Sequence, residues 1–340
     1  MAQEEINISD MQKKVIILLL LVSLVSACIK EDMDKCMGKM RWYFQYTYNN
    51  QRQDQLARQV GNIRIYLFDQ TTGKLTDIIQ VNKKDIIRGW IEPDIPTGLY
   101  TAVAWATSGE EITLGGYREA GITTLDEFRV MLNCRALAES IPGEATPMQQ
   151  QFDDLFFAIA TDVLVTTSNG RTVEFDFIKN TNMLKVKVTG LEYLTRAIPS
   201  EQPLCVFVTG PHESYLYNNR IDANTREVHY EPPYTALTAT SMDFDIKIQR
   251  LDIDYHTLHP VLLYIRSKGT VQQDMVIPIN IMDAILQTKD AQGKFVWKNQ
   301  EDIDCQEEFP IEVSILHDLS IRVSVNGFEI IDTKPEIGRD

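Results

Sequence analysis

The 340-residue sequence lacks a long hydrophobic run, an excess of basic side chains and the common catalytic signatures. Its apolar run Val15–Val25 has eleven residues and would span about 16 Å as a helix, roughly half of a bilayer core, so we expect no permanent transmembrane helix there. With 33 basic against 48 acidic side chains, the formal charge is −15. Phosphate backbones and anionic lipids repel such a chain. We therefore expect no nucleic-acid partner and no electrostatic adhesion to membranes.

Catalytic and metal-binding motifs are also missing. The sequence has no GxSxG elbow, no P-loop, no GxGxxG and no CxxC, and His256 and His259 form an HxxH without a helical pattern around them. Alternating acids, which can hold calcium or form a glycosidase pair but more often lie on a solvated strand face, occur at Asp243/Asp245 and Asp252/Asp254. The sequence thus predicts a protein that is not an enzyme and has no metal site.

The N-terminal segment provides a different route to a membrane. Two lysines precede the apolar run, and the run ends in Ser26-Ala27-Cys28. This is the pattern of a secretory signal followed by a bacterial lipobox, in which the peptide is cut before a cysteine that then receives acyl chains. We expect residues 1–27 to be a lipoprotein signal peptide, Cys28 to carry the lipid, and residues 28–38 to be a polar tether.

Four other cysteines remain after Cys28. An exported chain is compatible with disulfides, and four cysteines allow three connectivities. Two domains favour Cys36–Cys134 and Cys205–Cys305, and buried thiols are the alternative. The spacing leaves both possibilities open.

From Lys39 onward, apolar residues alternate at the period of two that is typical of β-strands. In the first expected strand, one face carries Met40, Trp42, Phe44, Tyr46 and Tyr48. Further strands are expected at 62–69, 99–105, 173–177, 184–188, 204–209, 244–248, 261–266, 275–281, 311–316 and 320–331. No segments of helical length alternate with these strands, so the sequence predicts an all-β protein built from β-sandwiches.

One short helix and one domain boundary are also expected. Thr124–Glu127 has the form of a capping box, and Phe128, Met131 and Leu132 follow at helical spacing. They predict a helix of two or three turns within a connection. A polar break at Asn180–Asn182 divides the chain into an N-terminal domain, 39–180, and a C-terminal domain, 181–340.

The order of several segments resembles the anchor-subunit family of fimbrillin-type (type V) pili, which are outer-membrane lipoproteins of Bacteroidales. After the lipobox and an acidic tether containing Cys36, these segments are Asn62–Asp69 (NIRIYLFD), Pro96–Trp105 (PTGLYTAVAW), Asp154–Ala158 (DLFFA) and Phe177–Leu191 (FIKNTNMLKVKVTGL). The resemblance extends from Cys28 to about Ile331. It implies two tandem transthyretin-like (Greek-key) β-sandwich domains and no enzymatic activity.

The resemblance also implies a role and partners. Such a protein tethers a fimbrial shaft to the outer membrane and limits fimbria length, and it is expected to be held by lipid and exposed at the cell surface. The expected partners are a fimbrial stalk subunit (a major or minor fimbrillin), joined by β-strand addition, and outer-membrane lipid, contacted by the acyl chains on Cys28. No cofactor is expected beyond this covalent lipid.

The position of the first arginine bears on the kind of subunit. The resemblance implies that stalk precursors are cut after an arginine, which removes their lipidated leader. The first arginine after Cys28 is Arg41, which lies inside the first expected strand, with no long leader strand before it. This favours an uncleaved anchor over a stalk subunit.

Two points stay open at the level of sequence. The hairpin formed by Ile321–Val325 and Phe328–Ile331 is part of the second core or a strand offered to the partner. The alternative function is a surface lipoprotein that binds glycan or another ligand, for which aromatic side chains are available at Tyr215, Tyr217, Tyr230 and Tyr234.

Overall fold

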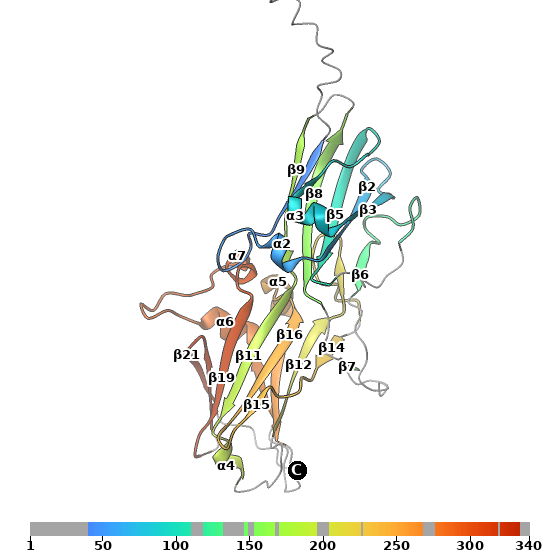
Figure 1. Cartoon of the computed structure of the whole chain (residues 1–340). Coiled ribbons are helices and arrows are strands. Elements are labelled where there is room, and N and C mark those ends of the chain that lie inside the picture. Colours follow the sequence, from blue (N-terminus) through green and yellow to red (C-terminus); the bar gives the residue numbers. More distant parts are fainter. Residues whose placement is uncertain are drawn as a thin grey trace, which may run out of the picture.

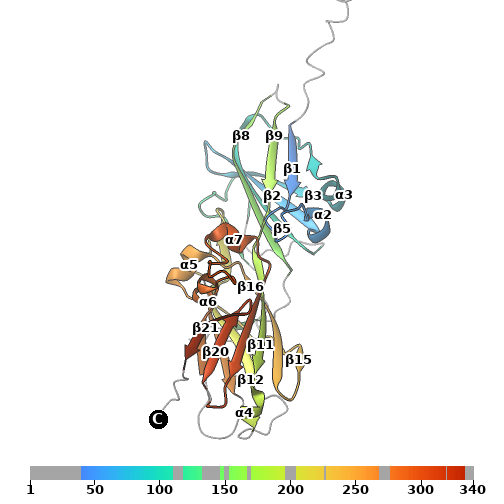
Figure 2. The same cartoon turned by 90° about the vertical axis from the view of Figure 1, so that its left-hand side faces the viewer.

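The protein consists of two β-sandwiches arranged end to end along one long axis (Figures 1 and 2). The computed structural model describes residues 40–109, 118–131, 146–148, 153–166, 170–195, 204–225, 227–267, 276–318 and 320–333. The predicted signal peptide, lipidation site and tether therefore lie outside the described residues. Within the described part, strands predominate and helices are short, which confirms the all-β prediction and its β-sandwiches.

The first sandwich packs a three-stranded sheet of order β4-β1-β9 against a five-stranded sheet of order β10-β8-β5-β2-β3. β1 lies between antiparallel β4 and parallel β9. The strands are β1 (Arg41–Gln45), β2 (Asn62–Asp69), β3 (Leu75–Val81), β4 (Trp90–Ile91), β5 (Gly98–Thr107), β8 (Leu155–Val165), β9 (Thr172–Asp176) and β10 (Ile178–Lys179).

The second sandwich packs a sheet of order β15-β16-β11-β19-β20-β21 against one of order β18-β17-β12-β14-β7. Its strands are β7 (Thr146–Met148), β11 (Thr181–Thr189), β12 (Leu204–His212), β14 (Glu227–Tyr230), β15 (Ala236–Leu237), β16 (Ser241–Gln249), β17 (Leu262–Ser267), β18 (Val276–Asn280), β19 (Glu308–Ile315), β20 (Ile321–Val325) and β21 (Phe328–Thr333). β7 precedes β8 in the chain but pairs with β14, so the N-terminal half adds a strand to the second sandwich.

The strand period predicted the buried faces well. Trp42, Phe44 and Tyr46 of the first strand region are at most 3% exposed, and they face Ile63 and Ile65 of β2 across the first core. In β11, Leu184, Val186 and Val188 enter the second core in the same alternating way. The sequence predicts these faces because successive side chains of a strand point to opposite sides.

A third layer covers the outer face of the five-stranded sheet. It is the two-stranded sheet of β6 (Arg129–Met131) and β13 (Ser214–Leu216). Phe128 and Val130 are buried there against Tyr66 and Trp105, whose side chains point away from the first core. This explains why β5 is buried on both faces.

The same layer corrects the helix prediction. Thr124 and Glu127 do interact as in a capping box, with Thr124 Oγ1 donating to Glu127 Oε2 over 2.8 Å. However, a turn and then β6 follow, not a helix. The predicted helix is wrong because Phe128 and Val130 are buried at the strand period, and this packing overrides local propensity.

Short helices occur in connections where none was predicted. They are α2 (Leu56–Gln59), α3 (Lys83–Arg88), α4 (Leu191–Thr195), α5 (Ile253–Leu258), α6 (Ile281–Gln287) and α7 (Gln300–Asp304). Four of them begin at an Asn or Asp whose side chain accepts a hydrogen bond from a backbone N–H in the first turn: α3 at Asn82, α5 at Asp252, α6 at Asn280 and α7 at Asn299. The sequence signal was therefore present at the N-caps, but the segments are too short for a helical hydrophobic period to show.

Candidate functional site

The predicted attachment site, Cys28, lies outside the described residues, as do Cys36 and Cys134. The described body begins at Met40, directly after the predicted tether. None of the helices in the described ranges is long and apolar enough to cross a membrane.

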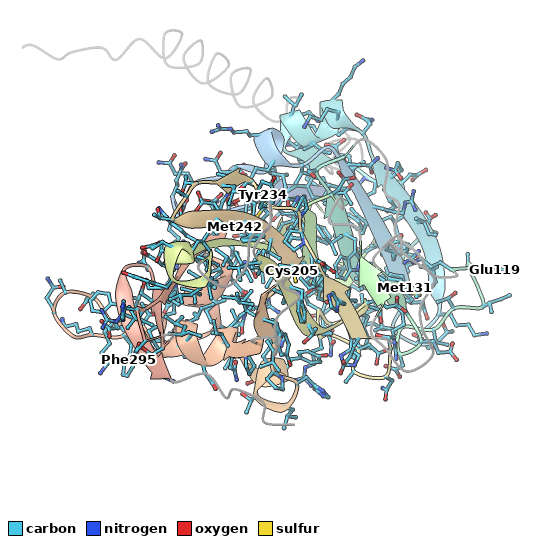
Figure 3. All side chains as sticks on the ribbon, turned by 90° about the horizontal axis from the view of Figure 1, so that it is seen from below. Glu119, Met131, Cys205, Tyr234, Met242 and Phe295 are labelled. Atoms are coloured by element: carbon cyan, nitrogen blue, oxygen red, sulfur yellow. The ribbon has the colours of Figure 1, made fainter. Side chains whose placement is uncertain are left out.

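The predicted Cys205–Cys305 disulfide is absent, because both residues are buried thiols. Cys205 is the second residue of β12 and pairs with Arg266 of β17, while Cys305 ends α7. Figure 3, which views the molecule from below, shows Cys205 among the side chains of the second sandwich. Burial is the main cause that raises the pKa of the Cys305 thiol above its ordinary value. For this pair the alternative of buried thiols holds.

The aromatic side chains considered for glycan binding are mostly inside the protein. Tyr215 and Tyr230 are fully buried, Tyr217 is partly buried, and Tyr234 is 41% exposed. The Tyr215 hydroxyl donates to the backbone oxygen of Asn180 over 3.1 Å. These four tyrosines therefore do not form an exposed stacking surface.

The HxxH pair also has a structural explanation. His256 lies inside α5, and its Nδ1 is 3.0 Å from the backbone oxygen of His259, which caps the helix. The prediction that this stretch has no helical context is wrong. Burial lowers the pKa of His256 to about 4. No group of three or more His, Cys, Asp or Glu in the described ranges is arranged to hold a metal ion.

One acid of each pair serves local structure. Asp245 on β16 forms a 2.8 Å ion pair with Lys185 of β11. Asp252 accepts from the Tyr255 backbone N–H at the start of α5 and also pairs with Arg250 over 3.1 Å. The arrangement thus explains both residues without calcium or a catalytic role.

The most elaborate polar arrangement lies between the two sandwiches. Asp154, just before β8, forms 2.9 Å ion pairs with Lys179 of β10 and with Lys247 of β16 in the second sandwich. Thr181 Oγ1 also donates to Asp154 Oδ1 over 3.1 Å. Burial acts to raise the pKa of Asp154, but the two ammonium groups lower it below its ordinary value.

A second set of contacts joins the lower end of the first sandwich to α7 and the residues after it. The Tyr46 hydroxyl donates to Glu307 Oε1 over 2.7 Å, and Gln59 Nε2 donates to the same atom over 3.1 Å. At the surface, Arg52 pairs with Glu301 over 3.0 Å. The partly buried bonds to Glu307 and the exposed pair at Glu301 therefore both hold the first sandwich against α7 and the residues after it.

Apolar packing crosses the junction as well. The Trp105 ring of β5 lies 5.5 Å from the Tyr215 ring of β13. Arg129 of β6 pairs with Asp222 over 2.7 Å, and the side-chain amides of Asn180 and Asn219 hydrogen-bond to each other in the buried interior. Asn180, predicted as a polar break, is thus a fully buried hub of the junction. These contacts fix the two sandwiches to each other.

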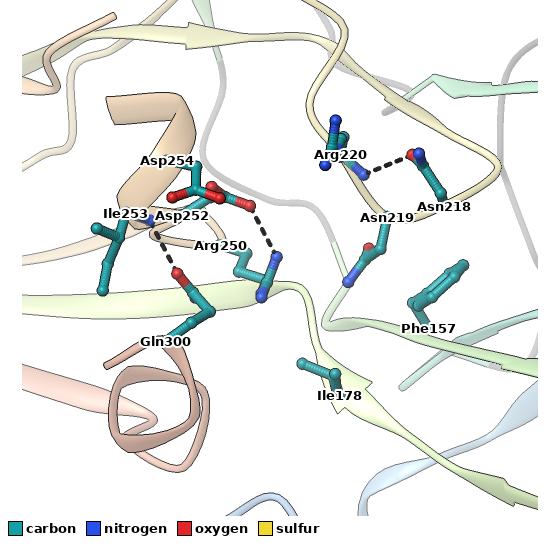
Figure 4. Close-up of a pocket in the computed structure, with 10 residues that line it drawn as sticks. All are labelled: Phe157, Ile178, Asn218, Asn219, Arg220, Arg250, Asp252, Ile253, Asp254 and Gln300. Atoms are coloured by element: carbon teal, nitrogen blue, oxygen red, sulfur yellow. Dashed lines mark hydrogen bonds and ion pairs between the residues drawn. The ribbon is translucent and has the colours of Figure 1, made fainter. Parts of the chain in front are cut away.

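A cavity of about 400 Å³ opens beside this junction (Figure 4). Its floor contains Arg250, which binds Asp304 through two hydrogen bonds of 2.7 and 2.9 Å. The ten lining residues are Phe157, Ile178, Asn218, Asn219, Arg220, Arg250, Asp252, Ile253, Asp254 and Gln300. They carry two positive and two negative charges and include no histidine, cysteine or serine, so the lining offers polar contacts but no nucleophile–base pair.

The sheet edges are the places where another chain can add a strand. In the first sandwich the outer strands are β4, β9, β3 and β10, and in the second they are β15, β21, β18 and β7. β20 buries Ile321, Val323 and Val325 in the second core, so the C-terminal hairpin belongs to that core and β21 forms its outer edge. Edge strands of this kind present unpaired backbone groups to a partner.

Fold and junction define a protein of two β-sandwiches that are joined by ion pairs, hydrogen bonds and aromatic packing. A family model for the fimbrillin-A associated anchor proteins Mfa1 and Mfa2 matches residues 33–334. The chain belongs to this family of fimbrial anchor proteins, which confirms the resemblance seen in the sequence. No curated protein matches the chain.

Solved structures of low sequence identity share the fold. A candidate polysaccharide-binding protein of Bacteroides thetaiotaomicron has a TM-score of 0.68 at 18% identity, covering 86% of this chain and 97% of that one. A candidate adhesin of Bacteroides ovatus has a TM-score of 0.65 at 18% identity, covering 86% and 94%. The fimbrial anchor protein Mfa2 of Porphyromonas gingivalis has a TM-score of 0.60 at 15% identity, covering 87% and 99%.

Proposed function

We propose that this protein is the anchor subunit that holds a fimbrium on the outer membrane through acyl chains on Cys28. The observation that carries the proposal is the anchor-family match over residues 33–334. The lipobox sequence Ser26-Ala27-Cys28 supports it, because it stands directly before the predicted tether and the sandwiches. On this proposal the two domains are residues 39–180 and 181–340, and neither needs a cofactor or performs catalysis.

Lipid chemistry accounts for attachment of an acidic protein. Each buried CH₂ group contributes about 0.8 kcal/mol, and one acyl chain alone binds a membrane only marginally. Several chains on Cys28 hold the protein on the membrane despite the formal charge of −14 that remains once residues 1–27, with three acids and two bases, are removed. The polar residues 28–38 then separate the sandwiches from the lipid surface.

Strand addition is the proposed link to the shaft. A fimbrillin strand laid along an open sheet edge gains backbone hydrogen bonds, and its alternate side chains set the register. A lipid-held subunit at the base ends the chain of pilins at that point. Retention of this subunit on the cell is the proposed basis of the limit on fimbria length.

Replacement of Cys28 tests the lipid attachment. We expect Cys28→Ala to move the protein from the outer-membrane fraction into the periplasm or medium, with fimbriae shed from the cells. Cys205→Ala is the matched control, because Cys205 is a buried thiol outside the lipobox, and it should stay with the membranes. Sedimentation of Cys28→Ala with the outer membrane contradicts the lipid proposal.

Deletion of the gene tests the fimbrial role separately. Electron microscopy should show fimbriae that are longer and easily detached, and complementation should restore both properties. Unchanged length and retention after deletion contradict the anchor role. The alternative of glycan capture has less support, because Tyr215 and Tyr230 are buried and do not offer a stacking face.

A further inference from the structure

β1 is placed where a pull on the predicted tether reaches the folded body. It begins at the end of the first sandwich that points away from the second sandwich, and it runs toward the second sandwich (Figure 2). It pairs in parallel with β9 over its whole length, from Arg41 opposite Thr172 to Gln45 opposite Asp176. A pull transmitted through residues 28–38 therefore acts on the N-terminal end of β1, along the strand.

β9 is held from its opposite end. After Asp176 the chain continues through β10 into β11, which is paired on one side with β16 and on the other with β19. A force held by the second sandwich therefore pulls β9 from its C-terminal end. Two parallel strands pulled in this way are forced to slide past each other.

We propose that the β1–β9 pair is a shear clamp that carries the pull between the lipid tether and the rest of the anchor. The inference rests on the proposed attachment at Cys28. Hydrogen bonds between parallel strands are evenly spaced along the pair and slant across the gap between the two strands. Sliding therefore strains all of them together, whereas peeling breaks them one after another, so a sheared pair resists a larger force.

Buried aromatic rings oppose the same sliding. The rings of Trp42 and Phe44, on β1, lie 5.4 and 5.6 Å from the ring of Phe175 on β9. All three side chains are at most 3% exposed. Movement of β1 by one residue pair would bring these rings out of register in the first core, which adds a packing cost to the lost hydrogen bonds.

The lower end of β1 is fastened by Asp176 of β9. Its carboxylate accepts hydrogen bonds from Gln45 Nε2 over 3.1 Å, from the Thr47 backbone N–H over 3.0 Å and from Thr47 Oγ1 over 2.6 Å. The Phe177 backbone N–H donates to the Gln45 oxygen over 2.8 Å. The bond from Tyr46 to Glu307 then connects the end of this strand region directly to the second sandwich.

The upper end of β1 is fastened through Arg41. Its backbone N–H donates to the Arg171 oxygen over 3.0 Å, and its Nε donates to Glu92 Oε1 over 2.9 Å. Its guanidinium also lies 4.7 Å from the centre of the Trp90 ring on β4. The first strand residue that a pulled tether would move is thus held from both sides of β1.

Single-molecule force spectroscopy on the full mature chain without lipid tests the clamp. One handle is placed at residue 28 and the other at Ala239, in the exposed turn before β16. The second handle loads the nine residue pairs of β11 and β16, more than the five pairs of β1 and β9, so the clamp should yield first. We expect Asp176→Ala to lower the force of the first rupture.

Two comparisons keep the test specific. Asp245→Ala, the same change on β16, should leave the first rupture force unchanged because Asp245 pairs with Lys185 of β11, away from the clamp. Thr47→Val removes one hydrogen bond to Asp176. It replaces Asp176→Ala in the measurement if that variant does not fold. Thr47→Val should lower the first rupture force when the chain is pulled between residue 28 and Ala239. It should leave that force unchanged when the chain is pulled between Thr72, in the β2–β3 turn, and Ala239.

Equal first rupture forces for the wild type, Asp176→Ala and Thr47→Val overturn the clamp. The measurement uses no membrane, so this result leaves the lipid anchor standing. Conversely, sedimentation of Cys28→Ala with membranes contradicts the proposed lipid attachment, while the measured rupture forces of the β1–β9 pair remain valid.

Discussion

Lys247 Nζ lies 2.9 Å from Asp154 Oδ1, so an ammonium group of the second sandwich is neutralised by a carboxylate of the first. Lys179 Nζ approaches the other carboxylate oxygen at the same distance. The side chains of all three residues are at most 24% exposed. A single carboxylate thus lies between two ammonium groups, one from each sandwich.

The first prediction concerns that carboxylate. Asp154→Asn leaves two partly buried ammonium groups without this counter-charge. Removing one partner of a fully buried pair lowers the free energy of unfolding by about 3–5 kcal/mol, and we expect a loss up to that size here. Asp245→Asn is the matched control, because its pair with Lys185 is about 40% exposed and such pairs contribute about 0–1 kcal/mol. Urea denaturation measures the free energy of unfolding of both variants. Equal losses for the two variants contradict a special role of Asp154.

The second prediction concerns the floor of the cavity. Asp304→Asn breaks the double hydrogen bond between Asp304 and Arg250, whose side chains are 5% and 9% exposed. We expect a loss of about 3–5 kcal/mol in the free energy of unfolding. Glu329→Gln, which breaks the exposed 3.0 Å pair with Arg322, should cost about 0–1 kcal/mol. A loss at Asp304 no larger than at Glu329 would show that the buried pair does not stabilise the junction.

The third prediction is a pH dependence that arises from His256. Burial lowers the pKa of His256 to about 4 in the folded state, against 6.5 for the ordinary group. The unfolded state therefore binds the proton more readily than the folded state. The stability that neutral His256 contributes is complete above the pKa of the unfolded state, and it is lost as the pH falls toward the pKa of the folded state. Between about pH 7.5 and about pH 5 the loss is about 2 kcal/mol.

Chemical denaturation at several pH values checks this. His256→Asn should be less stable at neutral pH, because it perturbs a buried site, but its stability should fall less between the two pH values. His317, which lies in an exposed turn, provides the control variant His317→Asn. If the unfolding free energy of His256→Asn falls as much between the two pH values as that of the wild type, the pH dependence arises from other groups.

The fourth prediction concerns proteolysis at Arg41. The Arg41–Trp42 bond lies in a strand paired on both edges, so an arginine-specific protease cannot bind it without first opening β1. We expect the native mature chain to stay uncut there, while Arg52, in an exposed loop, is cut sooner. Intact mass and N-terminal sequencing distinguish the two cuts. Rapid cleavage after Arg41 in native protein contradicts the protection.

Several features could be predicted because their causes are local. The period of two in Leu184–Val188 directly reports a strand with one buried face, and in Asn62–Asp69 it places Ile63 and Ile65 on the face that enters the first core. The order of loosely similar segments was enough to indicate the anchor family, which the family model confirms over residues 33–334. The predicted boundary at Asn180 falls between β10 and β11, which belong to different sheets. The division into two domains itself stays a prediction, since contacts from β6 and β7 cross it.

Other features depended on partners far away in the sequence. The local sequence around Phe128 predicts a helix, but β13, more than eighty residues later, pairs with Arg129–Met131 and makes this segment a strand. Tyr215 looks like an accessible aromatic residue in a turn-rich stretch, yet Trp105 and Asn180 enclose it. No local pattern contains these contacts.

The sequence by itself therefore determined many of the strands and their core-facing sides, the lipobox pattern at Cys28 and the family, because each is written in neighbouring residues. Only the tertiary structure decided that Asp154 joins the sandwiches and that β1 lies beside β9. The partners Gln45 and Asp176 are 131 residues apart in the chain. Such a pairing follows from the packing of whole sheets, where the buried area of both cores selects one arrangement among many that the strand pattern allows.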